Sequence, residues 1–244
     1  MVLREIGQIL EAWAPPEIAW EQDNIGLQVG SPRAKVRSIL VVLDVTDEVV
    51  AEARQKNIDL IVSHHPLLFK PLRSVNTDGR VGRLVKALLK HEIALFSAHT
   101  NLDFIAGGVS FSLAKALGVR NAKILQAKAH VYKKLSVFIP KDHVDSVTEA
   151  IAAVGGGSIG NYDWCSFRTE GIGTYRPNDK AKPYQGHRGD IEHARETRLD
   201  MVVPAWNLQK VVDAMIASHP YEEVAYDVYD LANASSSHGA GAIG

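Results

Sequence analysis

The sequence predicts an α/β protein with a parallel sheet and flanking helices, followed by a second, α+β domain. Two observations predict the first part. Apolar runs of strand length alternate with segments whose apolar residues recur at helical spacing, and polar residues do not alternate with apolar ones within the runs. The order strand–helix–strand–helix–strand is typical of a parallel sheet covered by helices. A third observation, the order β-α-β-β-α-β over residues 134–231, predicts a ferredoxin-like arrangement for the second part.

The first part begins with apolar residues at helical spacing from Leu3 to Trp13, and the Ala-Pro-Pro that follows ends this helix. The continuous apolar run 38–45 predicts a strand buried on both faces. Thr46 is a suitable N-cap for a helix over 46–56. We expect further elements in this order: strand 58–63, helix 81–91, strand 93–98, and helix 108–118, which ends at Gly118.

The second part changes in character near residue 130. Its expected elements are strand 134–140, a helix with an apolar stripe from Val144 to Val154, strand and turn 163–175, strand 197–204, helix 207–219 and strand 223–231. A polar loop occupies 177–190. We therefore expect three regions: a first domain over 1–129, a ferredoxin-like domain over 130–232, and a flexible tail over 233–244, which is rich in small residues.

Composition narrows the class of protein. The formal net charge of -1 gives no support for a polyanionic partner, which argues against general nucleic-acid binding. No apolar run reaches the roughly 18 residues of a membrane span, and the N-terminus lacks a signal-peptide core. Cys165 is the one cysteine, so no intrachain disulfide can form. We expect a cytoplasmic protein with no membrane partner.

Polar side chains follow two of the predicted parallel strands. The sequence Ser-His-His-Pro, with His64 and His65, follows strand 58–63, and Ala-His-Thr-Asn-Leu-Asp, with His99 and Asp103, follows strand 93–98. The carboxyl ends of parallel strands open on the same edge of the sheet, where ligands bind in such folds. These four side chains are therefore expected to converge.

Imidazole and carboxylate groups are ordinary ligands of zinc, iron and manganese. Adjacent histidines at a strand end are expected to diverge, so they suit two ions better than one. Two-metal sites support hydrolysis. The alternative to a metal ligand is a histidine in a loop whose ring nitrogens are hydrogen-bonded within the protein. We interpret His99 as a capping residue or as an orienter of a ligand, and favour the capping role.

Other motifs point to chemistry less directly. A phosphate loop and a nucleophile elbow are both absent from the sequence. His219, Glu222 and Glu223 are possible metal ligands, but they lie at the end of a helix in the second part. We favour a helix-ending loop in which Tyr221 is packed.

Several motifs in order carry a family resemblance. Residues 23–30 (DNIGLQVG), 63–69 (SHHPLLF) and 98–103 (AHTNLD) resemble the NGG-interacting-factor-three-like family, whose bacterial members are labelled GTP cyclohydrolase I type 2 homologues. Residues 160–167, 171–177 and 219–229 look like the inserted domain of its long members. The resemblance covers nearly the whole chain.

The resemblance implies a split α/β core with a ferredoxin-like (CutA-like) insert, a dinuclear centre of divalent zinc, iron or manganese, and a ring-shaped homohexamer. The family's metal ligands fall on His64, His65 and Asp103. Its label implies a metal-dependent hydrolase acting on a purine nucleotide or another small molecule. The alternative is a non-catalytic metal-binding, regulatory or assembly protein.

The resemblance also implies that long members resume the core after the insert with a Gly-His-x-x-x-Glu type motif that completes the metal site. No such motif follows here, and the chain ends at residue 244. We therefore expect only the first half of the core, with lower metal occupancy and an exposed sheet edge and apolar face.

Overall fold

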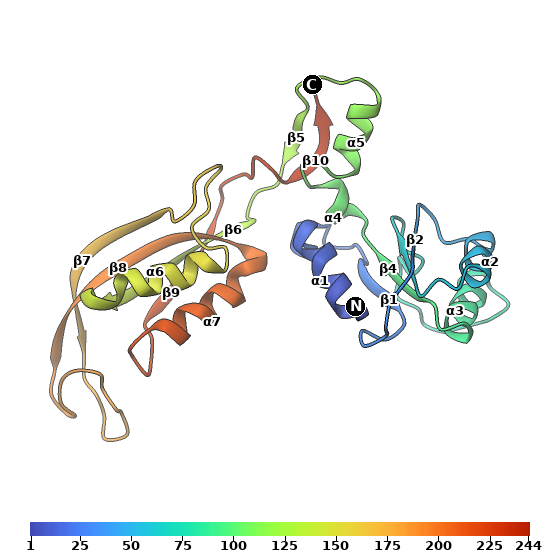
Figure 1. The fold of residues 1–244 in the computed structure, drawn as a ribbon. Helices are drawn as coiled ribbons and strands as arrows, with labels where there is room; N and C mark the ends of the chain where they lie inside the picture. The colour runs from blue at the N-terminus through green and yellow to red at the C-terminus, as the bar shows by residue number, and fades with distance from the viewer. The chain divides into compact units, whose positions relative to one another are not determined.

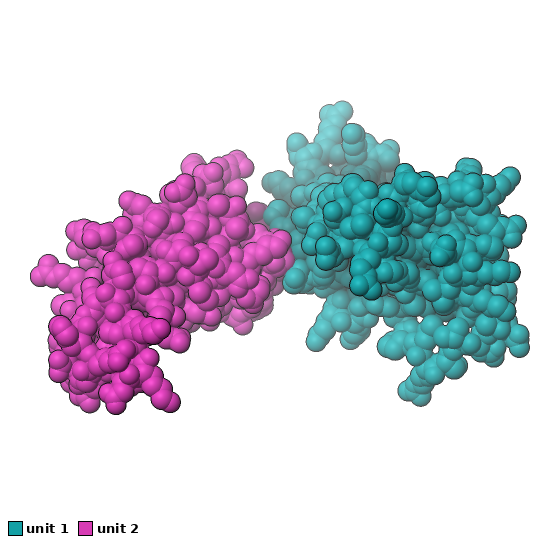
Figure 2. Space-filling view, turned by 60° about the horizontal axis from the view of Figure 1, so that its bottom comes forward, with its two compact units in different colours: residues 1–128, 237–244 teal, residues 129–236 magenta.

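The structure is a computed structural model that describes residues 1–244. The chain forms two compact units, residues 1–128 with 237–244 and residues 129–236 (Figures 1 and 2). Each unit has its own sheet and its own apolar core. None of the helices is both long enough and apolar enough to cross a bilayer.

A four-stranded sheet in the order β1-β4-β3-β2 organises the first unit. Its strands are β1 (Gly26–Val29), β2 (Ile39–Val42), β3 (Leu60–Ser63) and β4 (Ala94–Ser97). The strands β2, β3 and β4 are parallel, which confirms the predicted parallel sheet, and β1 joins β4 antiparallel. Successive residues of β3 face opposite sides, so each face has its own cluster of apolar residues.

Helices cover both faces of this sheet. The helices α2 (Asp47–Gln55) and α3 (Arg80–Lys90) pack through Ala53 and Leu88 on the face that carries Ile61. The helix α1 (Leu3–Trp13) packs through Leu3 on the other face, which carries Leu60. The predicted cap at Thr46 is present, because its hydroxyl accepts a hydrogen bond from the Val49 N–H.

The strand β2 departs from the prediction. The run 38–45 was expected to be buried on both faces, but Ile39, Val41 and Leu43 are exposed, and 76% of Val41 is accessible. Leu40 and Val42 face the core, so burial alternates along β2. The reason is position: β2 is an edge strand of the sheet, and apolar composition alone cannot distinguish an edge strand from a central one.

The last part of the first unit holds the short helix α4 (Thr100–Asp103), the helix α5 (Val109–Ala116) and the antiparallel pair β5 (Lys123–Ala127) and β10 (Gly239–Ile243). Gly118 follows α5 with a φ of 75°, as expected for a helix-ending glycine.

The expectation of a flexible tail over 233–244 is wrong for residues 239–243. Their backbone hydrogen-bonds to β5, which the small side chains do not reveal in the sequence.

The second unit contains a four-stranded antiparallel sheet in the order β7-β8-β6-β9. Its strands are β6 (Tyr132–Pro140), β7 (Ser166–Tyr175), β8 (Glu192–Pro204) and β9 (Tyr226–Leu231), with helices α6 (Val144–Ala153) and α7 (Leu208–Ser218). This is the predicted ferredoxin-like order. Three single-turn 3₁₀ segments complete the chain, Pro16–Ile18 in the first unit and Lys141–His143 and Ala205–Asn207 in the second.

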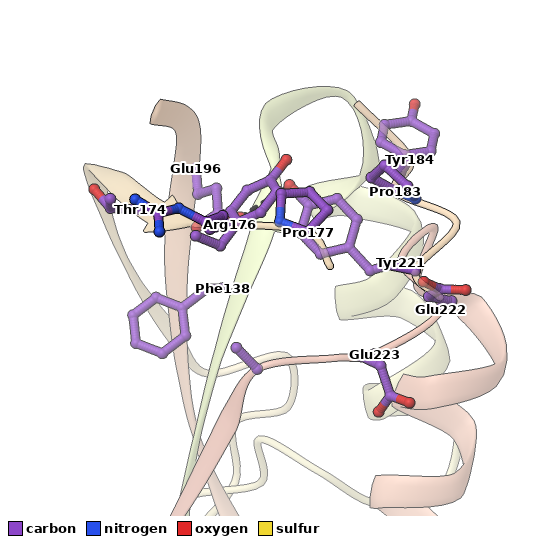
Figure 3. A pocket seen from close by; sticks show the side chains of 14 residues that line it. Phe138, Thr174, Arg176, Pro177, Pro183, Tyr184, Glu196, Tyr221, Glu222 and Glu223 are labelled. Carbon is purple, nitrogen blue, oxygen red and sulfur yellow. Dashed lines mark hydrogen bonds between the residues drawn. The ribbon is translucent and has the colours of Figure 1, made fainter. Parts of the chain in front are cut away.

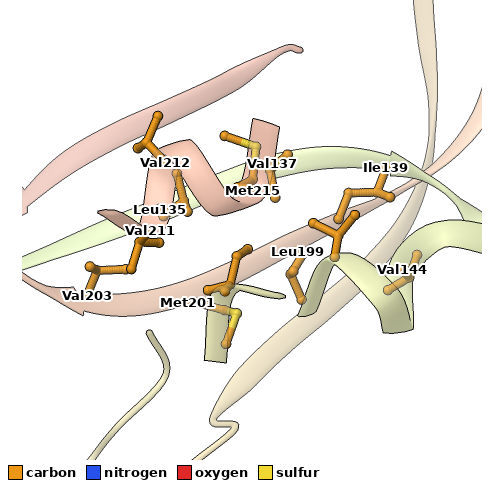
Figure 4. Packing of buried hydrophobic residues seen from close by; sticks show 12 residues of the cluster. Leu135, Val137, Ile139, Val144, Leu199, Met201, Val203, Val211, Val212 and Met215 are labelled. Carbon is orange, nitrogen blue, oxygen red and sulfur yellow. The ribbon is translucent and has the colours of Figure 1, made fainter. Parts of the chain in front are cut away.

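The core of the second unit lies between its sheet and its two helices (Figure 4). Leu135, Leu199 and Met201 from the strands pack with Ile151 and Met215 from the helices, and all five are almost completely buried. This core is independent of the histidine-bearing sheet.

Candidate metal centre

Three histidines meet beyond the carboxyl ends of the parallel strands. His64 and His65 follow β3, and His99 follows β4. One ring nitrogen of each lies within 4.8 Å of those of the other two. The ring centroids are 5.1 Å apart for His64 and His65, 5.2 Å for His64 and His99, and 5.7 Å for His65 and His99. The sheet-edge argument thus predicts the convergence of these side chains.

The expected divergence of His64 and His65 is wrong. Both residues lie in a bend directly after β3, so the side-to-side alternation of an extended strand has ended. Their backbone N–H groups still bond to the carbonyls of Val42 and Leu43, which fixes the bend against the end of β2. The two rings are tilted by 42° and face the same cluster.

Each histidine uses its Nδ1 atom for a hydrogen bond away from the cluster. His64 Nδ1 lies 2.9 Å from the carbonyl oxygen of Ala98. His65 Nδ1 lies 2.9 Å from Asp44 Oδ1, and His99 Nδ1 lies 2.9 Å from Asp23 Oδ1. An oxygen acceptor at Nδ1 selects the tautomer with the proton there, which leaves the Nε2 lone pair free. Three such lone pairs suit a metal ion.

Asp103 lies beside this group. It ends the helical turn of α4, and its Oδ1 lies 3.5 Å from His64 Nε2. The side chain of Asp103 remains partly exposed, so its carboxylate is accessible to solvent or to a ligand. Asp103 and His65 therefore each lie beside His64, while the group of ligand atoms within 4.8 Å of one another consists of the three histidines.

Asp23 is the most enclosed acidic group of the site. Its side chain is only 2% exposed and accepts hydrogen bonds from His99 Nδ1, the Thr100 N–H and the Thr100 hydroxyl. Burial raises the pKa of Asp23, but the bonds from Thr100 and His99 outweigh this effect and hold the pKa below its ordinary value. Asp23 therefore stays ionised and orients His99.

His99 occupies the N-cap position of α4, as favoured from the sequence, but its side chain makes no hydrogen bond to the start of the helix. The ring joins the other two histidines, and Asp23 holds it. Asp23 and Asp44 are partners of the histidines that were not predicted from the sequence. Asp44 offered a signal, since it follows β2 as the histidines follow β3 and β4. Asp23 is the first residue of the motif 23–30, and its spacing from His99 gives no local signal of their contact.

The second unit has possible ligand residues of its own. His219 is buried, its Nε2 lies 3.0 Å from the Phe138 carbonyl oxygen, and its Nδ1 accepts from the Tyr221 N–H. These bonds support the loop interpretation of residues 219–223. A further group, His187, Asp190 and Glu192, brings its ligand atoms within 4.8 Å of one another, in the loop before β8 and at the first residue of that strand. His187 and Asp190 are exposed, and exposed acidic groups are common without a metal.

The fold and site define a class: an α/β protein with a histidine–carboxylate cluster at the edge of a parallel sheet. The family model described as Duf34/NIF3 (NGG1p interacting factor 3) matches residues 1–226. The chain belongs to this family. This confirms the resemblance read from the motifs.

Relatives agree with this assignment. A Bacillus subtilis protein named GTP cyclohydrolase 1 type 2 homolog is 42% identical over 99% of this chain. A Halalkalibacterium halodurans protein of the same name is 41% identical over 97% of it. The chain spans 65% and 64% of these two relatives, so it is shorter than either.

Solved structures show the same fold. The crystal structure of a Bacillus cereus protein related to NIF3 aligns with a TM-score of 0.83 and 42% identity, over 98% of this chain and 64% of that one. A Staphylococcus aureus protein aligns with a TM-score of 0.69 and 30% identity, over 99% of this chain and 63% of that one. Both support the fold class of the two units.

Proposed function

We propose that this chain binds divalent metal at the histidine cluster, with His64, His65 and Asp103 as ligands and His99 as a further one. The observation that carries the proposal is the common use of Nδ1. All three rings donate Nδ1–H to an oxygen acceptor, which turns their Nε2 lone pairs into available ligand atoms. If these were ordinary loop histidines, there would be no reason for all three to direct Nδ1 outward to an acceptor and Nε2 inward to the same place.

The donor set fits a divalent transition metal. Neutral imidazole and carboxylate suit zinc, iron and manganese, and the cluster contains both. Asp23 and Asp44 accept hydrogen bonds from two of the rings, which fixes the direction of these imidazoles. Two ions are proposed from the family resemblance.

The proposed activity is metal-dependent hydrolysis. A divalent ion supplies Lewis-acid and water-activating chemistry at such a site. The chain contributes the accessible carboxylate of Asp103 as a ligand beside His64, and Asp23 keeps the ring of His99 fixed. Relatives are named GTP cyclohydrolase 1 type 2 homolog, so the proposed substrate is a purine nucleotide.

Association with further copies is also proposed, as the hexameric ring of the family resemblance implies. The exposed apolar residues of the edge strand β2 and its end, Val41 and Leu43, support an interface in the first unit. Multi-angle light scattering of the chain would detect this association. A monomer at high micromolar concentration would contradict it.

The experiment on activity compares wild type with Asp103→Ala after both are loaded with zinc, manganese or iron(II). Chromatography would follow the conversion of GTP. We expect the variant to lose the conversion, because it removes a proposed ligand of the ion that would activate water. Asp78→Ala, in an exposed loop of the same unit, is the matched control. Metal binding without any conversion by wild type would instead identify a non-catalytic metal-binding protein.

A further inference from the structure

The second unit contains a cavity of about 430 Å³ that the proposed function does not use (Figure 3). It lies between the end of β7 with the loop that follows and the segment after α7, and it includes Phe138 from β6 and Glu196 from β8. Cavities that bind small molecules are typically about 300–1,000 Å³ in volume. The cavity is therefore large enough for a metabolite-sized ligand.

Aromatic side chains form much of the wall. Tyr175, Tyr184 and Tyr221 line the cavity together with Phe138. The Tyr184 and Tyr221 rings are 5.8 Å apart and inclined by 44°, and the Tyr175 and Tyr221 rings are 6.5 Å apart and inclined by 58°. The three tyrosine rings are therefore inclined to one another and do not form the parallel walls of a slot that stacks a flat ring.

The charge around the cavity is negative. The lining includes three carboxylates, Glu196, Glu222 and Glu223, and one guanidinium, Arg176, which gives a net formal charge of -2. Aromatic faces are also electron-rich, so both features attract a cation and disfavour an anion.

Two of the carboxylates are held in place. The Tyr221 hydroxyl donates to Glu196 Oε1 at 2.9 Å, and the Lys182 N–H donates to Glu222. Burial and the bond to Glu196 raise the pKa of Tyr221, so its hydroxyl stays protonated and continues to donate. Gly173 leaves the space that the Glu196 carboxylate fills, since a Cβ there would lie 2.1 Å from Glu196 Oε2. The arrangement is a built pocket with a fixed negative wall.

We propose that this pocket binds a small organic cation with apolar groups on its nitrogen, such as a quaternary or methylated ammonium. The methyl groups would contact the tyrosine faces, and the positive charge would lie near the carboxylates. A hydrated inorganic cation would gain little from the aromatic walls. A neutral apolar molecule would gain nothing from the negative charge.

The experiment titrates the whole chain, by isothermal calorimetry, with choline and with its neutral analogue 3,3-dimethylbutan-1-ol. These two compounds have nearly the same shape and differ in charge. We expect choline to bind at least about fivefold more tightly, in line with the strength of cation–π contacts. Equal affinity for the two compounds, or no binding of choline at tens of millimolar, would overturn the proposal.

Variants locate the binding. Tyr184 is 53% exposed, so Tyr184→Ala is expected to fold and to weaken choline binding at least about threefold. Tyr184→Phe keeps the ring and should retain the wild-type affinity.

Glu223→Gln should weaken choline binding but leave the binding of the neutral alcohol unchanged. Tyr162→Ala, an exposed tyrosine of the same unit outside the cavity, is the control. Unchanged choline affinity in both Tyr184→Ala and Glu223→Gln would place the binding elsewhere and refute the assignment.

Discussion

The Nδ1 atom of His99 lies 2.9 Å from Oδ1 of Asp23, a residue 76 positions earlier in the chain. The bond links the segment before β1 to the end of β4 and fixes the direction of the imidazole ring. Asp23 is almost completely enclosed, whereas Asp44, which performs the same task for His65, is half exposed. The two carboxylates therefore allow a matched comparison of how strongly an orienting partner affects the proposed metal affinity.

Replacing Asp23 by Asn should weaken divalent-metal affinity by about 10- to 100-fold, because His99 loses its charged partner. Asp44→Asn should have a smaller effect, because water can replace the half-exposed carboxylate. Competition with a fluorescent chelator measures both affinities, and circular dichroism verifies folding. Equal affinities in wild type and a folded Asp23→Asn variant would contradict the orienting role.

The hydroxyls of Ser63 and Ser97 form a second link beneath the site. Their Oγ atoms are 2.8 Å apart on the neighbouring strands β3 and β4, and both residues are buried. Ser63→Ala should lower the free energy of unfolding by about 1–3 kcal/mol, because it leaves the Ser97 hydroxyl without this partner.

The double variant Ser63→Ala, Ser97→Ala should cost less than the sum of the two single variants, since no unpaired hydroxyl remains. Urea unfolding provides all four free energies of the cycle. If the two single losses of unfolding free energy add up to the loss in the double variant, the two serine hydroxyls do not interact.

The core of the second unit is expected to be sensitive to lost volume. Leu199 is fully buried among the residues of β6, β8 and the two helices. Leu199→Ala should lower the free energy of unfolding by about 2–5 kcal/mol through lost burial and the cavity that remains. Phe167→Ala, an exposed apolar residue on β7, is the control and should change stability little. Similar losses in the two variants would contradict the described core.

The stability of the second unit should fall as the pH is lowered. Burial lowers the pKa of His219 below 6.5, and its neutral ring satisfies both nitrogens, donating from Nε2 and accepting at Nδ1. Below about pH 6.5 the unfolded chain therefore binds the proton more readily than the folded chain, and the free energy of unfolding decreases. Above that pH the contribution is constant.

Denaturant unfolding at pH 7.5 and pH 5.5 measures this effect. The variant His219→Gln is expected to be less stable at both values but to lose less stability between them. A variant that loses as much stability as wild type on acidification would assign the pH dependence to other groups.

The sequence predicts the fold where pattern and composition determine it. The mainly apolar segments 58–63 and 93–98 contain the buried central strands β3 and β4, and Thr46 caps its helix as expected. The run 38–45 has the same composition but forms an edge strand, because neighbours in the sheet decide its burial. The pairing of Gly239–Ile243 with β5 likewise joins segments that are far apart in the sequence, and the residues 239–243 themselves do not indicate a strand.

The candidate site shows the same division. Strand order places His64, His65, His99 and Asp103 on one edge, and this follows from the sequence. The bend that turns His64 and His65 to the same side, and the choice of Asp23 as the partner of His99, depend on contacts between distant segments. Residue spacing carries no information about either.

The central claim is that the histidine cluster binds metal, and metal content per chain tests it most directly. Plasma mass spectrometry would be applied to wild type, to the double variant His64→Ala, His65→Ala and to His91→Ala, whose exposed histidine ends α3 in the same unit. We predict one or two divalent ions per chain in wild type and in His91→Ala, and none in the double variant. Equal metal content in all three proteins, or no metal in wild type after incubation with zinc, manganese and iron(II), would contradict it.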